Sequence, residues 1–288
     1  MKESMTGKHA WQLWLAVALM PVNWALETYK WYVLVNKFQP ISFAKSFESV
    51  LSGLSFAMNT PNRIGEYGGR ILYLQPAFRL RGIALTVFCS VSQLLITLIF
   101  GCISLLVLKQ PLQQAHFAGT GFSTLVFRLF TYGVLLAAVI TCLFYFRMSW
   151  LVSLMQRFPK VKEKFSFAFV LEHLTAVTNG KILFYSLLRF IVFAMQYVLM
   201  WKALQTEMDG WQAFWCISLV FLIMAIVPGF AIAEIGIRGK VALAIAGLFT
   251  TNALAVLAGT VTMWLLNLAL PALVGSLFLL TIKIFKER

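Results

Sequence analysis

The chain has 288 residues, of which 60% are hydrophobic and only 12% are charged, and its mean hydropathy is +0.84. A soluble domain carries about 25% charged residues, so this composition excludes a soluble protein and predicts an all-α integral membrane protein. The net charge of +14 lies mostly in short loops. The positive-inside rule explains it without nucleic acid, and no loop is long enough for a soluble catalytic domain.

Apolar runs long enough to span a bilayer recur along the chain, since one crossing needs about 20 residues. The predicted spanning helices cover residues 11–35, 82–108, 122–146, 181–201, 211–227 and 252–282. Two more helical segments, 41–59 and 231–249, carry charged residues and are marginal as full spans. We therefore expect one membrane domain over residues 1–288, with about 6–8 transmembrane or re-entrant helices.

Loop charges set the expected orientation. The 147–164 loop holds five basic residues against one glutamate, and the last six residues hold three more. The loops expected on the opposite side are nearly neutral: 109–121, 202–210 and 250–252. We expect the basic loops and the C-terminus to be cytoplasmic. The alternation places the N-terminus outside although it carries Lys2 and Lys8, so either the rule is weakly broken or an N-terminal helix is missing.

A short polar pattern occurs twice. Residues 64–70 read IGEYGGR and residues 232–238 read IAEIGIR, so Ile-small-Glu-x-Gly-x-Arg is shared. Each copy follows a proline and an apolar helix, and each precedes a long spanning helix. The loop charges orient the two long helices oppositely. This predicts an inverted repeat, an arrangement found in many transporters, with half-repeats of roughly 41–108 and 211–282.

Both copies are expected to break a helix inside the bilayer. Thr60 is a suitable N-cap and Pro61 suits a first helical position, so a helix start is predicted there. Arg63 would lie in its first turn, beside free amides that attract an anion. The second copy has Pro228 and Gly229 without a polar cap. Broken helices at membrane depth are tolerated only where protein or a water-filled cavity surrounds them.

Two Glu–Arg pairs belong to the repeated pattern. Glu66 and Arg70 are four residues apart, as are Glu234 and Arg238, so each pair falls on one helix face. A charge at the bilayer centre costs roughly 2.5–3.5 kcal/mol. Either the pairs only neutralise themselves and hold the broken helices together, or they line a cavity for a charged head group, since a paired arginine can exchange its partner for phosphate. With Arg63, these four are the predicted lipid- or anion-binding residues.

Four further residues are secondary candidates: Thr60, Lys30, Arg189 and Gln196. Snorkelling or a local pair with Glu27 is the favoured explanation for Lys30. Arg189 and Gln196 are seven residues apart and share a helix face. Polar residues in spanning helices, including Asn23 and Asn267, more often form interhelical hydrogen bonds than bind ligands.

No metal site or cofactor is expected. The three histidines are far apart, no CxxC is present, and the four cysteines lie inside apolar runs. A GxxxxGK[ST] nucleotide-binding motif is also missing. Transport, if it occurs, would therefore be downhill, ion-coupled or driven by a partner.

Four stretches carry a family resemblance: MPVNWALETYKW (20–31), TPNRIGEYGGRI (60–71), SLLRFIVFAMQY (186–197) and PGFAIAEIGIRG (228–239). In this order they resemble the lysylphosphatidylglycerol synthase transmembrane-region family, in its stand-alone bacterial branch. The resemblance implies a flippase-like domain of the bacterial cytoplasmic membrane that binds or moves a lipid. The aminoacyl-transferring domain is absent, so synthase activity is not implied. Members usually have one more helix before the asparagine–tryptophan segment, so we expect a short or truncated N-terminus.

The leading hypothesis is a lipid translocase or lipid-binding transporter, not an enzyme, acting on an anionic or lipid-linked head group. One alternative is an intramembrane lipid transferase with Glu66 or Glu234 as its base. The other is an accessory membrane protein that stabilises a partner complex in lipid synthesis or transport. The expected partners are membrane lipids that are anionic or contain phosphate.

Overall fold

The computed structural model describes residues 10–117, 124–148, 166–172, 174–227, 229 and 231–281, which contain helices and no strands. The α-helices, in chain order, are α2 (Ala10–Val35), α3 (Phe43–Met58), α4 (Gly65–Ile71), α5 (Arg79–Val107), α6 (Lys109–Phe117), α7 (Thr124–Phe146), α10 (Ala176–Ala203), α11 (Gly210–Ile226), α12 (Ala231–Ala246), α13 (Ala253–Trp264) and α14 (Leu270–Thr281). The 3-10 segments are η1 (Pro61–Arg63), η2 (Pro76–Phe78) and η3 (Ser166–Leu171), and η4 (Leu265–Ala269) is a π-helical turn.

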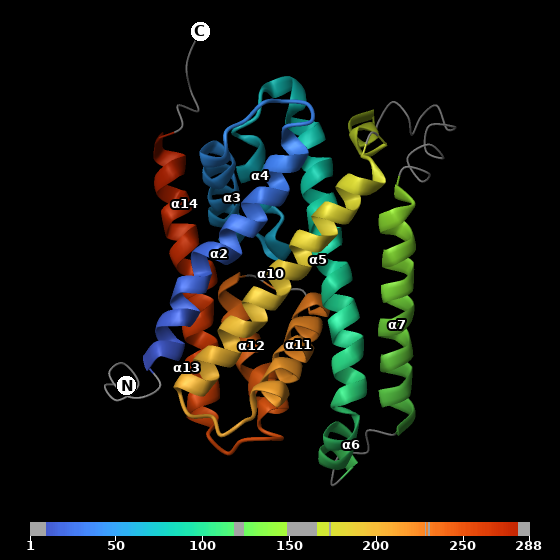
Figure 1. The fold of residues 1–288 in the computed structure, drawn as a ribbon, viewed down its shortest axis with the longest axis vertical. Helices are drawn as coiled ribbons and strands as arrows, with labels where there is room; N and C mark the ends of the chain where they lie inside the picture. The colour runs from blue at the N-terminus through green and yellow to red at the C-terminus, as the bar shows by residue number, and fades with distance from the viewer. Residues whose placement is uncertain are drawn as a thin grey trace.

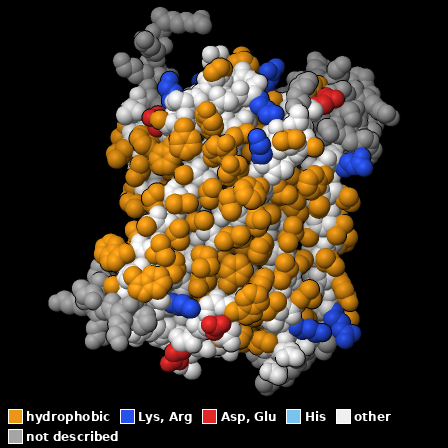
Figure 2. Space-filling model, viewed as in Figure 1, with side chains coloured by type: hydrophobic (Ala, Val, Ile, Leu, Met, Phe, Trp, Pro, Cys, Tyr) orange, Lys and Arg blue, Asp and Glu red, His pale blue; other side chains and the backbone are white. Residues whose placement is uncertain are grey.

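Among the described residues, four helical stretches are long and apolar enough to cross a membrane: Pro76–Val107, Leu125–Phe146, Ala176–Ala203 and Ala253–Thr281. Figure 2 shows hydrophobic side chains over the middle of the visible face, with charged side chains gathered towards the two ends. Lipid requires such a surface, because hydrocarbon cannot solvate charge. The predicted all-α, membrane-embedded class is therefore confirmed.

The two segments that are marginal as spans form short helices. Both α3 and α12 have 16 residues. At 1.5 Å per residue each is about 24 Å long, less than the roughly 30 Å of the hydrocarbon core. Neither helix is therefore long enough to cross the hydrocarbon core by itself.

The short helices belong to two hairpins that enter the bundle from opposite ends. Figure 1 shows α3 and α4 in the upper half of the molecule and α11 and α12 in the lower half. The hairpin tips meet near the middle. There the Asn62 N–H donates to the Gly229 carbonyl at 3.1 Å, and the Gly229 N–H donates to Asn62 Oδ1 at 3.2 Å. These reciprocal bonds join the two helix breaks that share the sequence pattern.

Each hairpin packs against the long helical segment that follows the other hairpin. The first helix of one hairpin, α3, lies along α14, and the first helix of the other, α11, lies along α5. A glycine allows the close approach in each case. A Cβ placed on Gly275 would lie 2.0 Å from the Leu51 carbonyl oxygen, and one on Gly101 would lie 2.7 Å from the Leu222 Cβ. Small residues allow backbones to pack closely where lipid supplies no hydrophobic driving force.

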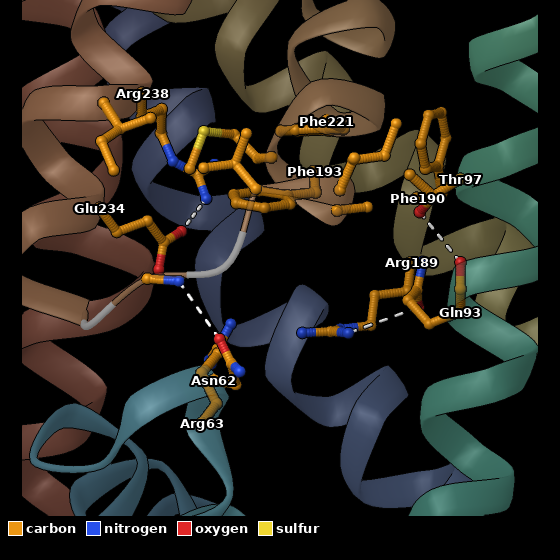
Figure 3. Close-up of a pocket in the computed structure, with 16 residues that line it drawn as sticks. Asn62, Arg63, Gln93, Thr97, Arg189, Phe190, Phe193, Phe221, Glu234 and Arg238 are labelled. Atoms are coloured by element: carbon orange, nitrogen blue, oxygen red, sulfur yellow. Dashed lines mark hydrogen bonds and ion pairs between the residues drawn. The ribbon is translucent and has the colours of Figure 1, made fainter. Parts of the chain in front are cut away.

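The buried apolar side chains of the described residues form two clusters, which adjoin near the middle of the bundle. On α5 one cluster ends at Leu95 and the other begins at Ile96, and on α10 Ile182 and Phe190 belong to different clusters. Between those two α10 residues lies Arg189, at the level of the hairpin tips (Figure 3). The fold therefore confines its internal charges to the middle of the bundle, where protein rather than lipid surrounds them.

The glycine contacts generate a stability prediction. Gly275→Ala forces its methyl group against the backbone of α3, so we expect a loss of about 1–3 kcal/mol in the free energy of unfolding. Gly133→Ala on α7 is the matched control, because nothing lies within 4 Å of its Cβ position. It should gain up to about 1 kcal/mol from helix propensity. Thermal unfolding in one detergent measures both, and equal midpoints would contradict the packing.

Candidate functional site

The first hairpin tip is a distorted turn and not a clean helix start. A 3-10 turn begins at Pro61, but Asn62 and Arg63 have φ values of 51° and 58°, which non-glycine residues rarely adopt. The α-helix begins only at Gly65, whose N–H donates to Thr60 Oγ1 at 2.8 Å. A helical segment therefore starts at Pro61 as predicted, but it is a short 3-10 turn and not yet the α-helix. The Thr60 hydroxyl satisfies an amide of the tip and does not face the cavity.

A cavity of about 490 Å³ lies between the hairpin tips (Figure 3). Its charged lining comes from three parts of the fold: Arg63 from η1, Arg189 from α10, and Glu234 with Arg238 from α12. Three guanidinium groups therefore face one carboxylate, which gives the lining an excess of positive charge. A smaller recess of about 50 Å³ shares these four residues and extends towards Asn23.

The three arginines keep unused donor capacity. The Nε atoms of Arg63, Arg189 and Arg238 are all buried without a hydrogen-bond partner among the described residues. The Arg63 side chain makes no ion pair or hydrogen bond with any residue that the structure describes. Buried donors are normally satisfied, so these groups are candidates to bind an acceptor from outside the described chain. An anion with several oxygen atoms would supply it.

The α12 pair is formed as the spacing predicts. The Arg238 guanidinium pairs with the Glu234 carboxylate, and its Nη1 donates to the Tyr197 hydroxyl at 3.3 Å. Arg238 is only 9% exposed. One hydroxyl and one carboxylate thus hold this arginine at the cavity wall.

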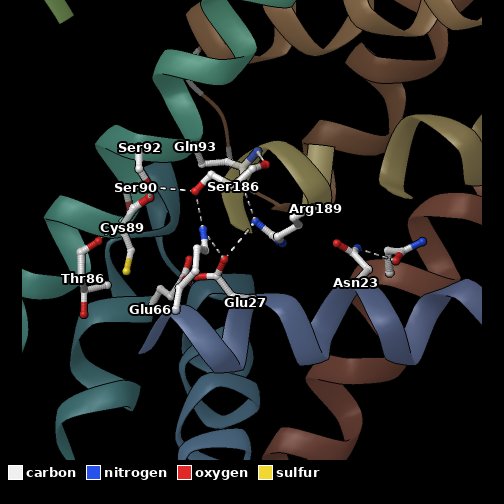
Figure 4. A network of polar contacts seen from close by, with 12 residues as sticks. Asn23, Glu27, Glu66, Thr86, Cys89, Ser90, Ser92, Gln93, Ser186 and Arg189 are labelled. Atoms are coloured by element: carbon white, nitrogen blue, oxygen red, sulfur yellow. Dashed lines mark hydrogen bonds and ion pairs between the residues drawn. The ribbon is translucent and has the colours of Figure 1, made fainter. Parts of the chain in front are cut away.

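The other predicted pair belongs to a larger buried cluster around Glu27 (Figure 4). Glu27 Oε2 lies 2.8 Å from Lys30 Nζ and 3.2 Å from Arg189 Nη1, and Oε1 lies 2.7 Å from Arg70 Nη2. Arg70 also pairs with Glu66, which confirms the predicted Glu66–Arg70 pair. Three cations therefore surround two carboxylates. Arg189 belongs to both this cluster and the cavity, so it connects the two.

Two secondary candidates have structural partners. Lys30 is fully buried, pairs with Glu27 and donates to Ser186 Oγ at 3.1 Å, so the local pair is confirmed and snorkelling is excluded. Gln196 Nε2 donates to the Ala16 carbonyl at 2.8 Å, which confirms an interhelical hydrogen bond.

The two asparagines that were predicted to form interhelical hydrogen bonds, Asn23 and Asn267, also have structural partners. Asn23 Nδ2 donates to Asn267 Oδ1 at 3.0 Å and joins α2 to the π turn η4. A π turn often marks a functional site, and this one lies beside the recess that extends from the cavity.

Of the nine predicted site residues, four line the cavity: Arg63, Arg189, Glu234 and Arg238. Three surround Glu27 behind it: Glu66, Arg70 and Lys30. Thr60 and Gln196 line neither space. Sequence reasoning treated Glu27 only as a neighbour of Lys30. Its position in a long apolar run was the available signal, because carboxylates inside membranes are usually functional.

The rest of the cavity wall is largely apolar. Aromatic rings from two helices line it: Phe190 and Phe193 from α10 and Phe221 from α11. Phe193 stacks on Phe221 with 4.9 Å between ring centroids. Charged side chains and aromatic rings together give the cavity a lining that is partly charged and partly apolar.

Comparisons with protein-family models, curated proteins and solved structures found no significant match. Within the described residues, no group of three histidine, cysteine, aspartate or glutamate side chains could hold a metal ion. The chemistry of the site must therefore be derived from its own side chains.

The Glu27 cluster generates a second prediction. Glu27→Gln removes one partner from each of three cations, and Glu66→Gln removes one partner from Arg70 alone. Breaking a buried pair costs roughly 3–5 kcal/mol, so Glu27→Gln should destabilise the protein by at least that amount. Glu66→Gln should cost less, since its side chain is 23% exposed and water can compensate. Unfolding in detergent measures both variants, and an equal or smaller effect of Glu27→Gln would contradict the central role of Glu27.

Proposed function

We propose that this protein binds an anionic lipid head group in the arginine cavity and translocates that lipid across the membrane. The observation that carries the proposal is the buried, unused Nε donor of each of three arginines around one cavity. A phosphate group offers several acceptor oxygens and a compensating negative charge. Arg63 is the main contact, because it has no competing partner among the described residues.

The location of the cavity favours a lipid over a soluble anion. It lies between the tips of two hairpins, in a protein whose long helices are apolar enough to span a membrane. Many transporters bind their substrates at broken helices near the membrane midplane. The chain has no nucleotide-binding motif, so the movement would be downhill, ion-coupled or driven by a partner.

We also propose that the two halves, roughly 41–108 and 211–282, form an inverted repeat within about 6–8 spanning or re-entrant helices. The opposed hairpins, the contact between their tips and the exchanged packing of α3 on α14 and α11 on α5 support this. Such a repeat can present the same cavity to either side of the membrane by rocking one half against the other. The motif resemblance favours a place in the flippase-like family and a bacterial cytoplasmic membrane.

Arg63→Gln tests the proposal directly. Losing one charge-assisted hydrogen bond costs about 1.5–3 kcal/mol, which lowers affinity by roughly tenfold or more. We expect liposomes with the wild-type protein to flip fluorescent phosphatidylglycerol, and Arg63→Gln to slow this flipping with little change in thermal stability. Arg128→Gln is the matched control, because Arg128 is exposed on α7 and lies outside the cavity.

Two outcomes would overturn the proposal. The first is no flipping of any anionic lipid by the wild-type protein, and the second is equal flipping by Arg63→Gln and the wild type. Conversion of lipid extracts into a new product without flipping would instead favour the transferase. Co-purification with one partner, unaffected by Arg63→Gln, would favour an accessory role.

A further inference from the structure

A second space lies beside the arginine cavity and is almost entirely apolar. It is a groove of about 440 Å³ formed by α5, α6, α7, α11 and α12, and it is called the α11 groove below. Leu219 and Ile223 of α11 form one wall, Phe127 and Phe130 of α7 form another, and the small Ala244 of α12 leaves room between them.

The α11 groove and the arginine cavity meet. Ile226 and Val227 line both spaces, so the end of α11 separates charged lining from apolar lining. A ligand that fills both must be an amphiphile, with an anionic group at the arginines and a hydrocarbon chain along α11. Neither a free phosphate nor a chain without a charged head group fits the two linings together.

A similar groove of about 400 Å³ lies beside the first hairpin, between α3 and α14. It extends from Ala269 of η4 along α14 to Leu279, and it touches Asn59 near the first hairpin tip. It shares no lining residue with the arginine cavity. Of these two grooves in the described structure, the α11 groove alone shares lining residues with the arginine cavity.

We propose that the α11 groove binds an acyl chain of the same lipid whose head group lies in the arginine cavity. The proposal rests on the proposed function and narrows the substrate to a phosphate-containing lipid with at least one hydrocarbon chain. Bilayer lipid is as apolar as the groove, so the groove adds little hydrophobic driving force. Its effect is to hold the chain beside the cavity, which raises the effective concentration of the head group there.

Photolabelling can test this with two lipids that carry a diazirine on one acyl chain, compared in three samples. The full-length protein in nanodiscs is illuminated with labelled phosphatidylglycerol, labelled phosphatidylcholine, or labelled phosphatidylglycerol after Ala244→Trp. We expect phosphatidylglycerol to label the groove faces of α7 and α11, and phosphatidylcholine to label them much less. Ala244→Trp fills the groove and should abolish this labelling while leaving the lipid-facing side of α7 labelled.

Two further variants separate the possible outcomes. Leu136→Trp, at a lipid-facing position of α7 that is 60% exposed, should leave groove labelling unchanged. Ile223→Trp fills the groove from α11 and replaces Ala244→Trp if that variant does not fold. Binding of dihexanoyl phosphatidylglycerol, whose chains are too short to fill the groove, should survive Ala244→Trp and be lost with Arg63→Gln.

Different results would contradict the acyl-chain site and the head-group site. Groove labelling that is equal for both head groups, or that persists with both groove-filling variants, would overturn the acyl-chain site and leave the arginine cavity in place. If neither phosphatidylglycerol binds the wild-type protein, the head-group site itself fails.

Discussion

One buried carboxylate holds the middle of this molecule together. Glu27 on α2 contacts cations from three other positions: Lys30 one turn along α2, Arg70 on α4 and Arg189 on α10. A cation is costly inside a bilayer unless a partner compensates it, so each of these side chains depends on Glu27 for its place. The hairpin that carries α4 is thereby joined to the two long helices beside it.

The same carboxylate links the architecture to the cavity. Arg189 touches Glu27 and also lines the cavity, where Arg63 and Arg238 have unused donors. The cavity can contain charged side chains because protein surrounds the elements that contribute them. It lies where the two hairpin tips form hydrogen bonds with each other. The broken helices and the buried charges thus require each other. The breaks bring Arg63 and Arg238 together, and the charges need the protein-lined space that the breaks create.

Much of the fold follows from the sequence, because apolar runs of about 20 residues leave little choice in a bilayer. The predicted helical segments match observed helices, although α6 lies in the predicted loop 109–121, and the spacing of Glu66 to Arg70 and of Glu234 to Arg238 gives both ion pairs. The contact between Arg189 and Glu27 could not be predicted, since it depends on how α2 and α10 pack. Local chemistry predicted the helix start at Pro61, but not the left-handed backbone of Asn62 and Arg63, where Asn62 bonds to Gly229 in the other hairpin.

The central claim is that the three arginines bind a lipid phosphate between the hairpin tips. An experimental structure of the protein in nanodiscs that contain phosphatidylglycerol tests it most directly. The account predicts phosphate density within about 3 Å of nitrogen atoms of Arg63, Arg189 and Arg238. A cavity that holds only water, with phosphate density confined to the two membrane faces, would contradict it.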